Sequence, residues 1–291
     1  MERRQLEYFL AVIDAGGFTA AAAAQHVSQP GLSHAIKTLE RELGAVLFHR
    51  LPRGARLTSA GEVLAESARR IVRETEVARA RVADVAGVVI GRLDLVALPG
   101  LLVAPLAGTI GRFRALHPQV QIRIVPAETP STIREAVRGG TAELGLTDEL
   151  PGSGELAVDL VNDQEFLAVL PPGSAPLEGG VLPLRTLLGM DVVTGPTGTT
   201  VRDFLTAHAA ELGMELTPVV EVALRGSAAY LAIAGAGVAV LPLPMAEMCR
   251  SYGVVLASLD PPLSRNVYLL RRTGSLSPAA QAMRALLLPD T

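Results

Sequence analysis

The sequence predicts an α/β protein whose first part is mainly helical. Three observations lead to this fold class. Apolar residues recur at helical spacing within residues 1–58, a repeat of four and three residues runs from 59 to 85, and from Arg92 short apolar runs alternate with helical segments. We therefore expect three parts: a small domain over 1–58, a long helix over 59–90, and an α/β region over 91–291.

The first segment is predicted to be an amphipathic helix and not a targeting signal. Leu6, Phe9, Leu10 and Ile13 fall on one helical face. The opening stretch MERRQLEYFL mixes acidic residues with its bases and has no long apolar core, so it lacks the pattern of a signal peptide.

Residues 18–37 have the pattern of two short helices joined by a tight turn. Residues 20–24 are five alanines, the strongest helix formers. Ser28 is a suitable N-cap for a second helix, and Pro30 is tolerated in the first turn because its missing N–H has no partner to lose. The second helix is therefore expected to start near Gln29.

This second helix is predicted to bury one face and to expose a polar, partly basic one. The buried face consists of four residues at spacings of four, three and four, Leu32, Ile36, Leu39 and Leu43. The other face suits DNA, because Gln and Ser can hydrogen-bond base edges in the major groove while Lys and Arg hold phosphates. The DNA contacts expected here are Ser28, Gln29, Pro30, Ser33, His34 and Lys37. The alternative is a solvated amphipathic helix in a small bundle.

A basic hairpin is predicted directly after this helix. The segment LPRGARLT, residues 51–58, has turn chemistry with Pro52 and Gly54 at its tip. Arg50, Arg53 and Arg56 would carry positive charge on it, suited to the DNA backbone or the neighbouring minor groove. The alternative is an ordinary exposed loop.

Taken together, these motifs make the first sixty or so residues resemble the winged helix-turn-helix of LysR-type transcriptional regulators. The chain carries F-T-x-A-A from Phe18, V-S-Q-P-x-L-S from Val27, I-x-x-L-E-x-x-L-G from Ile36, L-F-x-R from Leu47 and L-T-x-A-G from Leu57. The resemblance implies a dimeric or tetrameric, cytoplasmic regulator that binds a double-stranded DNA operator, and RNA polymerase as a further partner if it activates transcription.

Three positions depart from the family pattern. Gln25 stands where Leu is usual, Gly31 where Ala is usual, and His34 where Arg is frequent. Gly31 should weaken the second helix by about 1 kcal/mol relative to Ala, and His34 carries only partial positive charge at neutral pH. These departures concern the base preference.

Residues 59–85 are predicted to form a long helix that pairs with a second copy. Ser59 can cap its start, with Glu62 as the reciprocal partner. Small and apolar residues then follow one seam, Leu64, Ala68, Ile71, Thr75, Ala78, Val82 and Val85. The alternative is an isolated helix packed on its own domain. In the family that the chain resembles, this linker helix joins two subunits.

The remaining residues have the alternation of a mostly parallel sheet with helices between its strands. Strands are predicted at 93–98, 120–125, 144–146, 165–170, 191–193, 219–224, 238–241 and 267–270, and helices at 103–116, 131–138, 201–212, 227–234 and after Ser277. The resemblance implies two Rossmann-like subdomains, as in type 2 periplasmic binding proteins, with crossovers near Asn162 and Arg265. Subdomain I would comprise 91–162 and 266–291, and subdomain II 163–265.

A ligand is expected in the cleft between the subdomains, because open α/β sheets bind ligands at the carboxyl ends of their strands. Hydroxyls at the start of a helix near Thr199 and Thr200 suit a carboxylate. The expected effector contacts are Leu98, Pro99, Gly100, Thr129, Thr197, Gly198, Thr199 and Arg225, and the expected effector is a small organic anion with an apolar portion. The alternatives are simple helix caps for the threonines and a solvated surface position for Arg225.

Composition agrees with this organisation. The chain has 291 residues, 49% of them hydrophobic, and no Trp, so its cores must consist of Ala, Val and Leu. Residues 1–92 carry 13 Lys and Arg against 10 Asp and Glu, whereas the rest carries 13 against 19. The modest basic excess predicts that two or more DNA-binding modules act together. The single Cys249 excludes an intrachain disulfide framework and fits a reducing, cytoplasmic setting.

Membrane and enzymatic functions are disfavoured. The uncharged run 226–246 contains Gly235, Gly237, Pro242 and Pro244, so we predict a short helix, a buried strand and a turn there rather than a membrane span. The five histidines lack metal-ligand spacing, and the chain has no GxSxG elbow, P-loop or paired Cys–His site. No enzyme, metal or cofactor is predicted. Two rivals remain: a solute-binding protein of transport and a non-specific DNA-organising protein.

Overall fold

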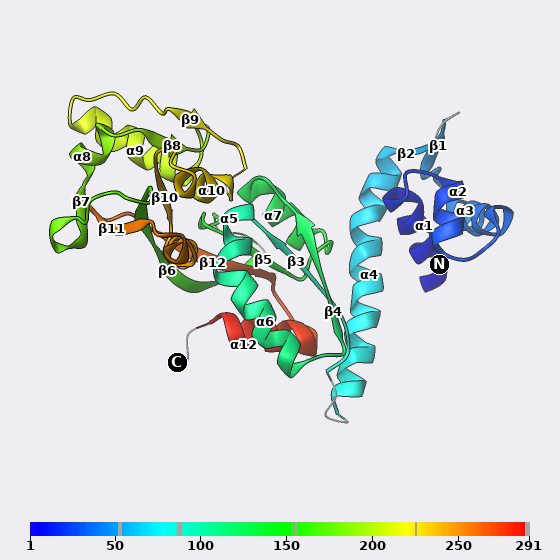
Figure 1. The fold of residues 1–291 in the computed structure, drawn as a ribbon. Coiled ribbons are helices and arrows are strands. Elements are labelled where there is room, and N and C mark those ends of the chain that lie inside the picture. The colour runs from blue at the N-terminus through cyan, green and yellow to red at the C-terminus, as the bar shows by residue number, and fades with distance from the viewer. Residues whose placement is uncertain (52–53, 86–88, 153, 155, 225, 289–291) are drawn as a thin grey trace.

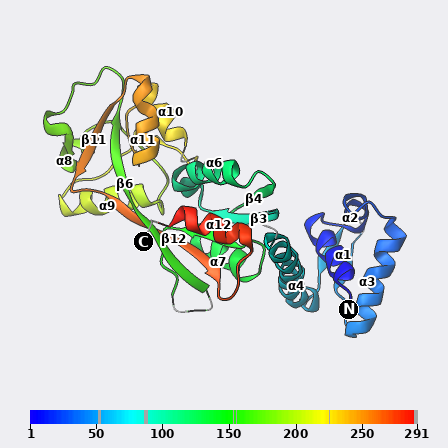
Figure 2. The same cartoon turned by 90° about the horizontal axis from the view of Figure 1, so that it is seen from below.

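The computed structural model describes all residues except 52–53, 86–88, 153, 155, 225 and 289–291. It consists of a helical N-terminal domain, one long helix and an α/β region with two lobes (Figure 1). A second view agrees that the long helix, α4, lies between the N-terminal domain and the first lobe (Figure 2). The predicted α/β class with a helical beginning is confirmed.

The N-terminal domain packs three helices against a small hairpin. The elements are α1 (Arg3–Asp14), α2 (Phe18–Ala24), α3 (Gln29–Leu43), β1 (Phe48–Arg50) and β2 (Ala55–Leu57). The strands pair antiparallel. As predicted, α3 starts at Gln29, and the Ser28 hydroxyl accepts a hydrogen bond from the Gly31 amide at 3.2 Å. Leu32, Ile36 and Leu39 are fully buried. Leu43 is not: it is 42% exposed, since α3 ends there and Gly44 turns the chain in the left-handed region.

Helix α4 spans Ser59–Asp84. A cap at Ser59, as predicted, would place the first helical residue at position 60, so the helix begins one residue earlier than expected. Thr58, not Ser59, is the N-cap. Its hydroxyl accepts from the Gly61 amide at 3.0 Å and donates to the Val46 carbonyl at 2.7 Å. Ser59 already has helical geometry, so it cannot occupy the extended conformation that a cap requires. The predicted Ser59–Glu62 capping pair is therefore wrong.

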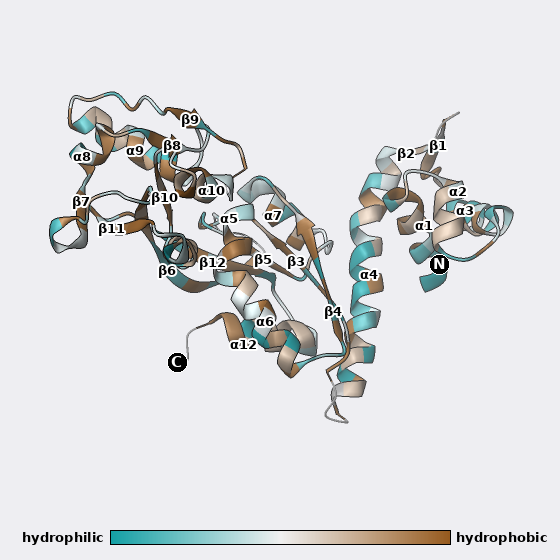
Figure 3. Ribbon diagram, viewed as in Figure 1, coloured by the Kyte–Doolittle hydropathy of each residue, from teal (hydrophilic) through white to brown (hydrophobic). Residues whose placement is uncertain are grey.

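The residues of the predicted α4 seam differ in burial along the helix. Ala68 is buried in the N-terminal core, Leu64 and Thr75 are half-buried, and Ile71, Ala78, Val82 and Val85 are exposed. Hydrophilic and hydrophobic residues alternate along α4, whereas the strands of the α/β region are mainly hydrophobic (Figure 3). Val82 is 76% exposed, which leaves an apolar stripe uncovered in the monomer.

The first lobe holds a parallel sheet portion with helices on both sides. Its elements are β3 (Gly91–Ala97), α5 (Pro99–Leu101), η1 (Leu102–Leu106), α6 (Ala107–Leu116), β4 (Val120–Pro126), α7 (Pro130–Arg138), β5 (Leu144–Thr147) and α12 (Pro278–Leu287). The helix predicted from 103 begins at Pro99 instead. Its second segment, η1, is a π-helix that contains Pro105.

The second lobe has its own sheet portion. Its elements are η2 (Glu178–Gly180), β7 (Val181–Pro183), α8 (Leu184–Leu188), β8 (Val192–Thr194), α9 (Thr200–Glu211), β9 (Val220–Glu221), α10 (Ser227–Ile233), β10 (Val238–Pro242), α11 (Leu243–Cys249), η3 (Arg250–Tyr252) and β11 (Val255–Asp260). The strand predicted at 219–224 covers only two residues. The turn predicted after the strand in 226–246 is wrong, because β10 continues directly into α11.

Two long strands, β6 (Leu156–Leu170) and β12 (Ser264–Arg272), cross between the lobes. They pair antiparallel with each other, β12 also with β5, and β6 also with β10 and β11. The ten-stranded sheet is therefore mixed, not mostly parallel. Separate hydrophobic cores lie on either side of the crossing. The boundaries at 162/163 and 265/266 stay a prediction. Below, subdomain I and subdomain II denote the two parts that these predicted boundaries define.

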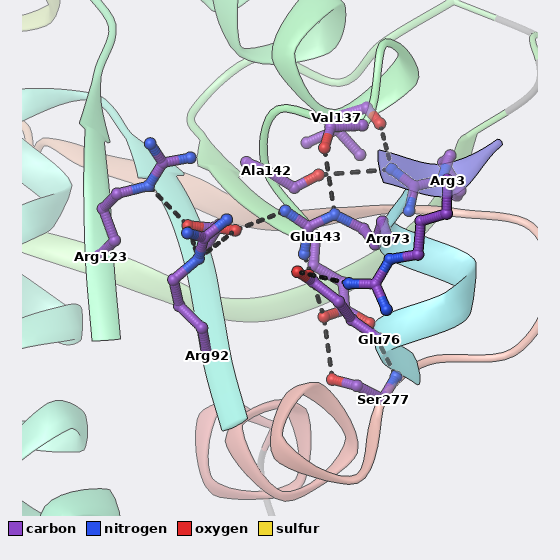
Figure 4. Close-up of polar contacts among 12 residues, drawn as sticks. Arg3, Arg73, Glu76, Arg92, Arg123, Val137, Ala142, Glu143 and Ser277 are labelled. Atoms are coloured by element: carbon purple, nitrogen blue, oxygen red, sulfur yellow. Dashed lines mark hydrogen bonds and ion pairs between the residues drawn. The ribbon is translucent and has the colours of Figure 1, made fainter. Parts of the chain in front are cut away.

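A buried charge cluster attaches α4 to subdomain I (Figure 4). The Arg73 guanidinium pairs with Asp94 of β3 and lies 3.6 Å from Glu143, and its Nε donates to the Gly140 carbonyl at 3.0 Å. Arg92 and Arg123 also contact the Asp94 carboxylate, and Glu143 accepts from the Ser277 amide and hydroxyl. Burial disfavours ionisation of Asp94, but these cations outweigh it and hold its pKa below the ordinary value.

No single helix among the described residues combines the length and apolar character that a membrane span needs. Only α1 and α2, which are bent by 119° to each other, meet these criteria as a pair.

Candidate nucleic-acid interface and ligand pocket

Helix α3 exposes most of the side chains that the sequence predicted as DNA contacts. Ser28, Gln29, Pro30, His34 and Lys37 are exposed, and Ser33 is half-buried. On the hairpin, Arg56 is exposed. Arg50 lies in β1, and Arg53 lies outside the described residues.

The hairpin tip and the start of α3 share one concave surface. Gln29, Leu51 and Gly54 line a depression of about 420 Å³ together with the turn between α1 and α2. Gly54 has a φ of 96°, and a Cβ on it would lie 2.6 Å from the Gly16 carbonyl oxygen. The Ala55 amide donates to that same oxygen at 3.2 Å. Glycine at 54 thus lets the hairpin rest on the helix turn, beside the first residues of α3.

A second cavity, of about 390 Å³, lies between the subdomains. Subdomain I contributes Pro99, Gly100 and Val103, from the segment that runs through the π-helix η1. Subdomain II contributes the ends of β8 and β10 and the starts of α9, α10 and α11. Most of the lining is apolar: Val193, Val201, Val222, Leu224, Ala228, Val240, Leu241, Pro242 and Met245.

Among the described residues that line this pocket, the charged group is the Arg265 guanidinium of β12. Its Nε donates to Gln164 Oε1 at 2.9 Å, and its Nη1 donates to Asp148 Oδ2 at 2.9 Å. The guanidinium carbon lies 5.2 Å from the centre of the Phe166 ring, within cation–π range. Thr200, the first residue of α9, donates its hydroxyl to the same Asp148 oxygen at 3.1 Å.

One hydroxyl of the pocket lining is buried without a partner. Thr194 ends β8 and is 3% exposed, and its Oγ1 has no hydrogen-bond partner within the described part of the chain. A buried hydroxyl is normally hydrogen-bonded, because leaving it unpaired costs about 1–3 kcal/mol. A ligand group in the cavity is one way to satisfy it.

The structure brings some of the predicted effector residues to the pocket and leaves others away from it. Pro99, Gly100 and Thr199 line the cavity. Leu98 is buried in the core of subdomain I, and Thr129 caps α7 by accepting from the Thr132 amide. Thr197 and Gly198 are exposed and outside the lining, and the Gly198 amide donates to Asp203. Arg225 lies outside the described residues.

The sequence reasoning missed several polar residues of this site, among them Asp148, Thr194 and Arg265. Asp148 and Thr194 both follow or end a strand at its carboxyl end, so the rule used for the cleft could have found them. Arg265 was placed near a crossover, but nothing in the sequence indicates that its side chain turns into the cavity. Among the described residues, no group of three or more His, Cys, Asp or Glu side chains could hold a metal ion.

Comparison with protein families gives two matches that together cover most of the chain. Residues 3–62 match the model "Bacterial regulatory helix-turn-helix protein, lysR family", and residues 86–290 match the model "LysR substrate binding domain".

Individual relatives are regulators. The SDS degradation transcriptional activation protein of a Pseudomonas species (strain ATCC 19151) is 32% identical over 298 residues, covering 99% of this chain and 95% of that protein. ClcR of Pseudomonas putida is 33% identical over 168 residues, and TfdT of Cupriavidus pinatubonensis 36% over 146. The match with these two spans 57% and 64% of their own lengths.

Solved structures share the fold. Full-length CbnR in complex with its target DNA has a TM-score of 0.67 at 23% identity, covering 99% of both chains. A full-length OxyR variant from Pseudomonas aeruginosa has a TM-score of 0.72 at 21% identity, covering 99% of this chain and 96% of that one.

Proposed function

This chain belongs to the LysR family of DNA-binding transcription regulators with an effector-binding domain, and we propose that a small organic anion with an apolar portion is its effector. The regulator would act in the cytoplasm as a homodimer or homotetramer on a partly symmetric operator, and would contact RNA polymerase if it raises transcription. Family membership makes it a regulator, not an enzyme, and removes the transport-protein alternative.

The DNA part of the proposal rests on α3 and the hairpin. The exposed Gln29 stands at the N-terminal end of α3, where recognition helices approach base edges, and Lys37 lies two turns further along. The exposed stripe with Ile71 and Val82 on α4 supports pairing of two copies, which would set the spacing of two recognition helices. The structural relative CbnR was solved with its target DNA.

Substitutions on α3 should separate base reading from phosphate binding. We expect Gln29→Ala to lower the preference for the operator over random DNA by about 1–3 kcal/mol, because a lost base contact costs that much discrimination. We expect Lys37→Ala to weaken binding to all sequences alike and to reduce the salt dependence by about one phosphate contact. Fluorescence anisotropy on a selected operator and on random duplexes, at several salt concentrations, measures both.

Two results would contradict this assignment of roles. Equal loss on operator and random DNA for Gln29→Ala would remove its base-reading role. A wild-type protein that binds both duplexes equally at physiological salt would favour the non-specific DNA-organising alternative.

The observation that carries the effector proposal is the composition of the interdomain pocket. Its volume of about 390 Å³ is that of a small-molecule site, and its walls are mostly apolar. At one side it meets the Arg265 guanidinium and the N-terminus of the 12-residue helix α9, where partial positive charge favours anions. The relative whose name refers to SDS degradation, the degradation of an alkyl sulfate, supports the same ligand chemistry.

Titration calorimetry with the full-length protein tests the proposal. The probes are octanoate, octyl sulfate and benzoate, with octylammonium and octanol as the cationic and neutral controls of equal chain length. We expect the anions to bind and to change the affinity for the operator, since an effector must bind two states of the regulator unequally. Binding of the amine or the alcohol only would overturn the assignment of an anionic effector.

A further inference from the structure

One buried ion pair at the pocket connects the two subdomains. Asp148 follows β5 in subdomain I, Thr200 begins α9 in subdomain II, and Arg265 lies at the start of β12, which crosses between them. The side chains of Arg265 and Asp148 are 7% and 15% exposed. The pair is therefore largely shielded from water, where a charge-assisted hydrogen bond is strong.

A single carboxylate oxygen of Asp148 receives both donors. Oδ2 accepts from Arg265 Nη1 at 2.9 Å and from the Thr200 hydroxyl at 3.1 Å. Nη1 also lies 3.3 Å from the Thr200 oxygen, so the three groups form a closed triangle. Arg265 and Thr200 line the cavity, whereas Asp148 contacts both of them without being part of the lining.

The site that holds the Asp148 carboxylate suits an anion. It combines a buried guanidinium, a hydroxyl donor and the N-terminal end of α9. The Thr200 hydroxyl has a single proton, so it can donate to Asp148 or to a ligand but not to both. A ligand anion that takes this hydroxyl proton together with Nη1 of Arg265 must therefore displace Asp148.

We propose that Asp148 competes with the effector for the hydrogen-bond donors of Arg265 and Thr200. This inference rests on the proposed function, because it concerns the same pocket and an anionic ligand. Asp148 thereby determines specificity, because an anionic oxygen can replace its charge-assisted hydrogen bonds, whereas a neutral hydroxyl brings no negative charge to the Arg265 guanidinium. Displacement also breaks the Thr200–Asp148 bond between the subdomains, so that binding is coupled to their relative position.

The test compares Asp148→Asn with Glu149→Gln in the full-length protein. Both changes remove one negative charge at neighbouring positions, but Glu149 is 58% exposed and pairs with Arg134 at 3.1 Å instead. Calorimetry with octanoate and octyl sulfate should give a Kd about tenfold lower for Asp148→Asn than for the wild type, since the neutral amide oxygen competes for the Arg265 guanidinium less strongly than the carboxylate does. Glu149→Gln should leave Kd within about twofold, because an exposed charge is well screened.

Each outcome separates the two proposals. Wild-type binding of the anions with an unchanged or higher Kd in Asp148→Asn would overturn the competition. Absence of anion binding in the wild type and in Asp148→Asn alike would overturn the proposed anionic effector itself. Melting curves establish that each variant folds, and Asp148→Ser, a smaller neutral substitution with the same expected direction, replaces Asp148→Asn if that variant does not fold.

Discussion

Replacing Arg73 by Met is expected to lower the free energy of unfolding of the α/β region by about 3 kcal/mol or more, since removing one partner of a buried ion pair leaves uncompensated charge. Asp94 and Glu143 are both buried, with side chains 1% and 2% exposed, and share the Arg73 guanidinium. Arg92 and Arg123 keep Asp94 partly paired, but both are half-exposed. Glu143 would keep the Ser277 amide and hydroxyl as its hydrogen-bond donors, and both are neutral.

The experiment uses Arg79→Met as its matched control. Arg79 lies on the same helix and is exposed, so this change removes the same atoms without opening a buried pair and should cost little. Differential scanning calorimetry resolves the transitions of the separate parts. Equal melting temperatures for the two variants would contradict a structural role of the cluster in holding α4 on subdomain I.

The pH dependence provides a second readout of the same substitution. The pKa of Asp94 is lowered in the folded wild type, so its ionisation contributes stability above the ordinary pKa of about 4, and that contribution is lost as the pH falls through the lowered value. Without Arg73 the folded pKa rises. The difference in stability between wild type and Arg73→Met should therefore shrink below about pH 4.

Gly61→Ala is expected to destabilise the N-terminal domain by about 3 kcal/mol, through overpacking and loss of a buried backbone contact. A Cβ at this position would lie 2.3 Å from the Leu47 carbonyl oxygen and 2.8 Å from Leu57 Cδ2. The backbone cannot easily move away, because the Thr58 amide donates to that same Leu47 oxygen at 3.0 Å and the Thr58 hydroxyl donates to Val46. The substitution should separate the hairpin from the first turn of α4.

Helix propensity alone would predict the opposite result, because alanine normally stabilises a helix relative to glycine. Gly108→Ala in α6 is the matched control, because Gly108 is exposed and a Cβ there meets no atom within 4 Å. It should stabilise the protein by about 0.5–1 kcal/mol. Chemical denaturation followed by circular dichroism measures both, and operator affinity reports the N-terminal domain. A neutral or stabilising Gly61→Ala would show that the contact with Leu47 relaxes at little cost.

Local sequence patterns correctly predicted those helices and strands whose boundaries depend on residues within the same element. The start of α3 at Gln29 was predictable because a cap and a first-turn proline act within four residues. The strand at 144–147 was predictable because it is buried on both faces. The crossing strand β6 was predicted only in its last six residues, since its first half is partly exposed and contains polar residues that pair with β12.

Caps and pocket contacts were harder to predict, because several residues nearby offer the same chemistry. Thr and Ser are both capping residues, so positions 58 and 59 offer the same chemistry. Thr58 is the N-cap, and its hydroxyl also donates a hydrogen bond to the Val46 carbonyl. Thr129, Thr197 and Thr199 all precede or begin helices, but only Thr199 lines the cavity. A hydroxyl at a helix start satisfies the local rule whether or not a second subdomain faces it.

The sequence by itself determined the class of this protein: a winged helix-turn-helix, a long linker helix and an α/β region, each encoded by periodicity and motifs within short segments. Only the tertiary structure decided which polar groups meet at the pocket. Asp148, Thr200 and Arg265 lie 52 and 65 residues apart along the chain, and Thr200 and Arg265 both reach the same carboxylate oxygen. Periodicity records which face of an element is buried, whereas a charge pair between distant elements depends on where the sheet brings them together.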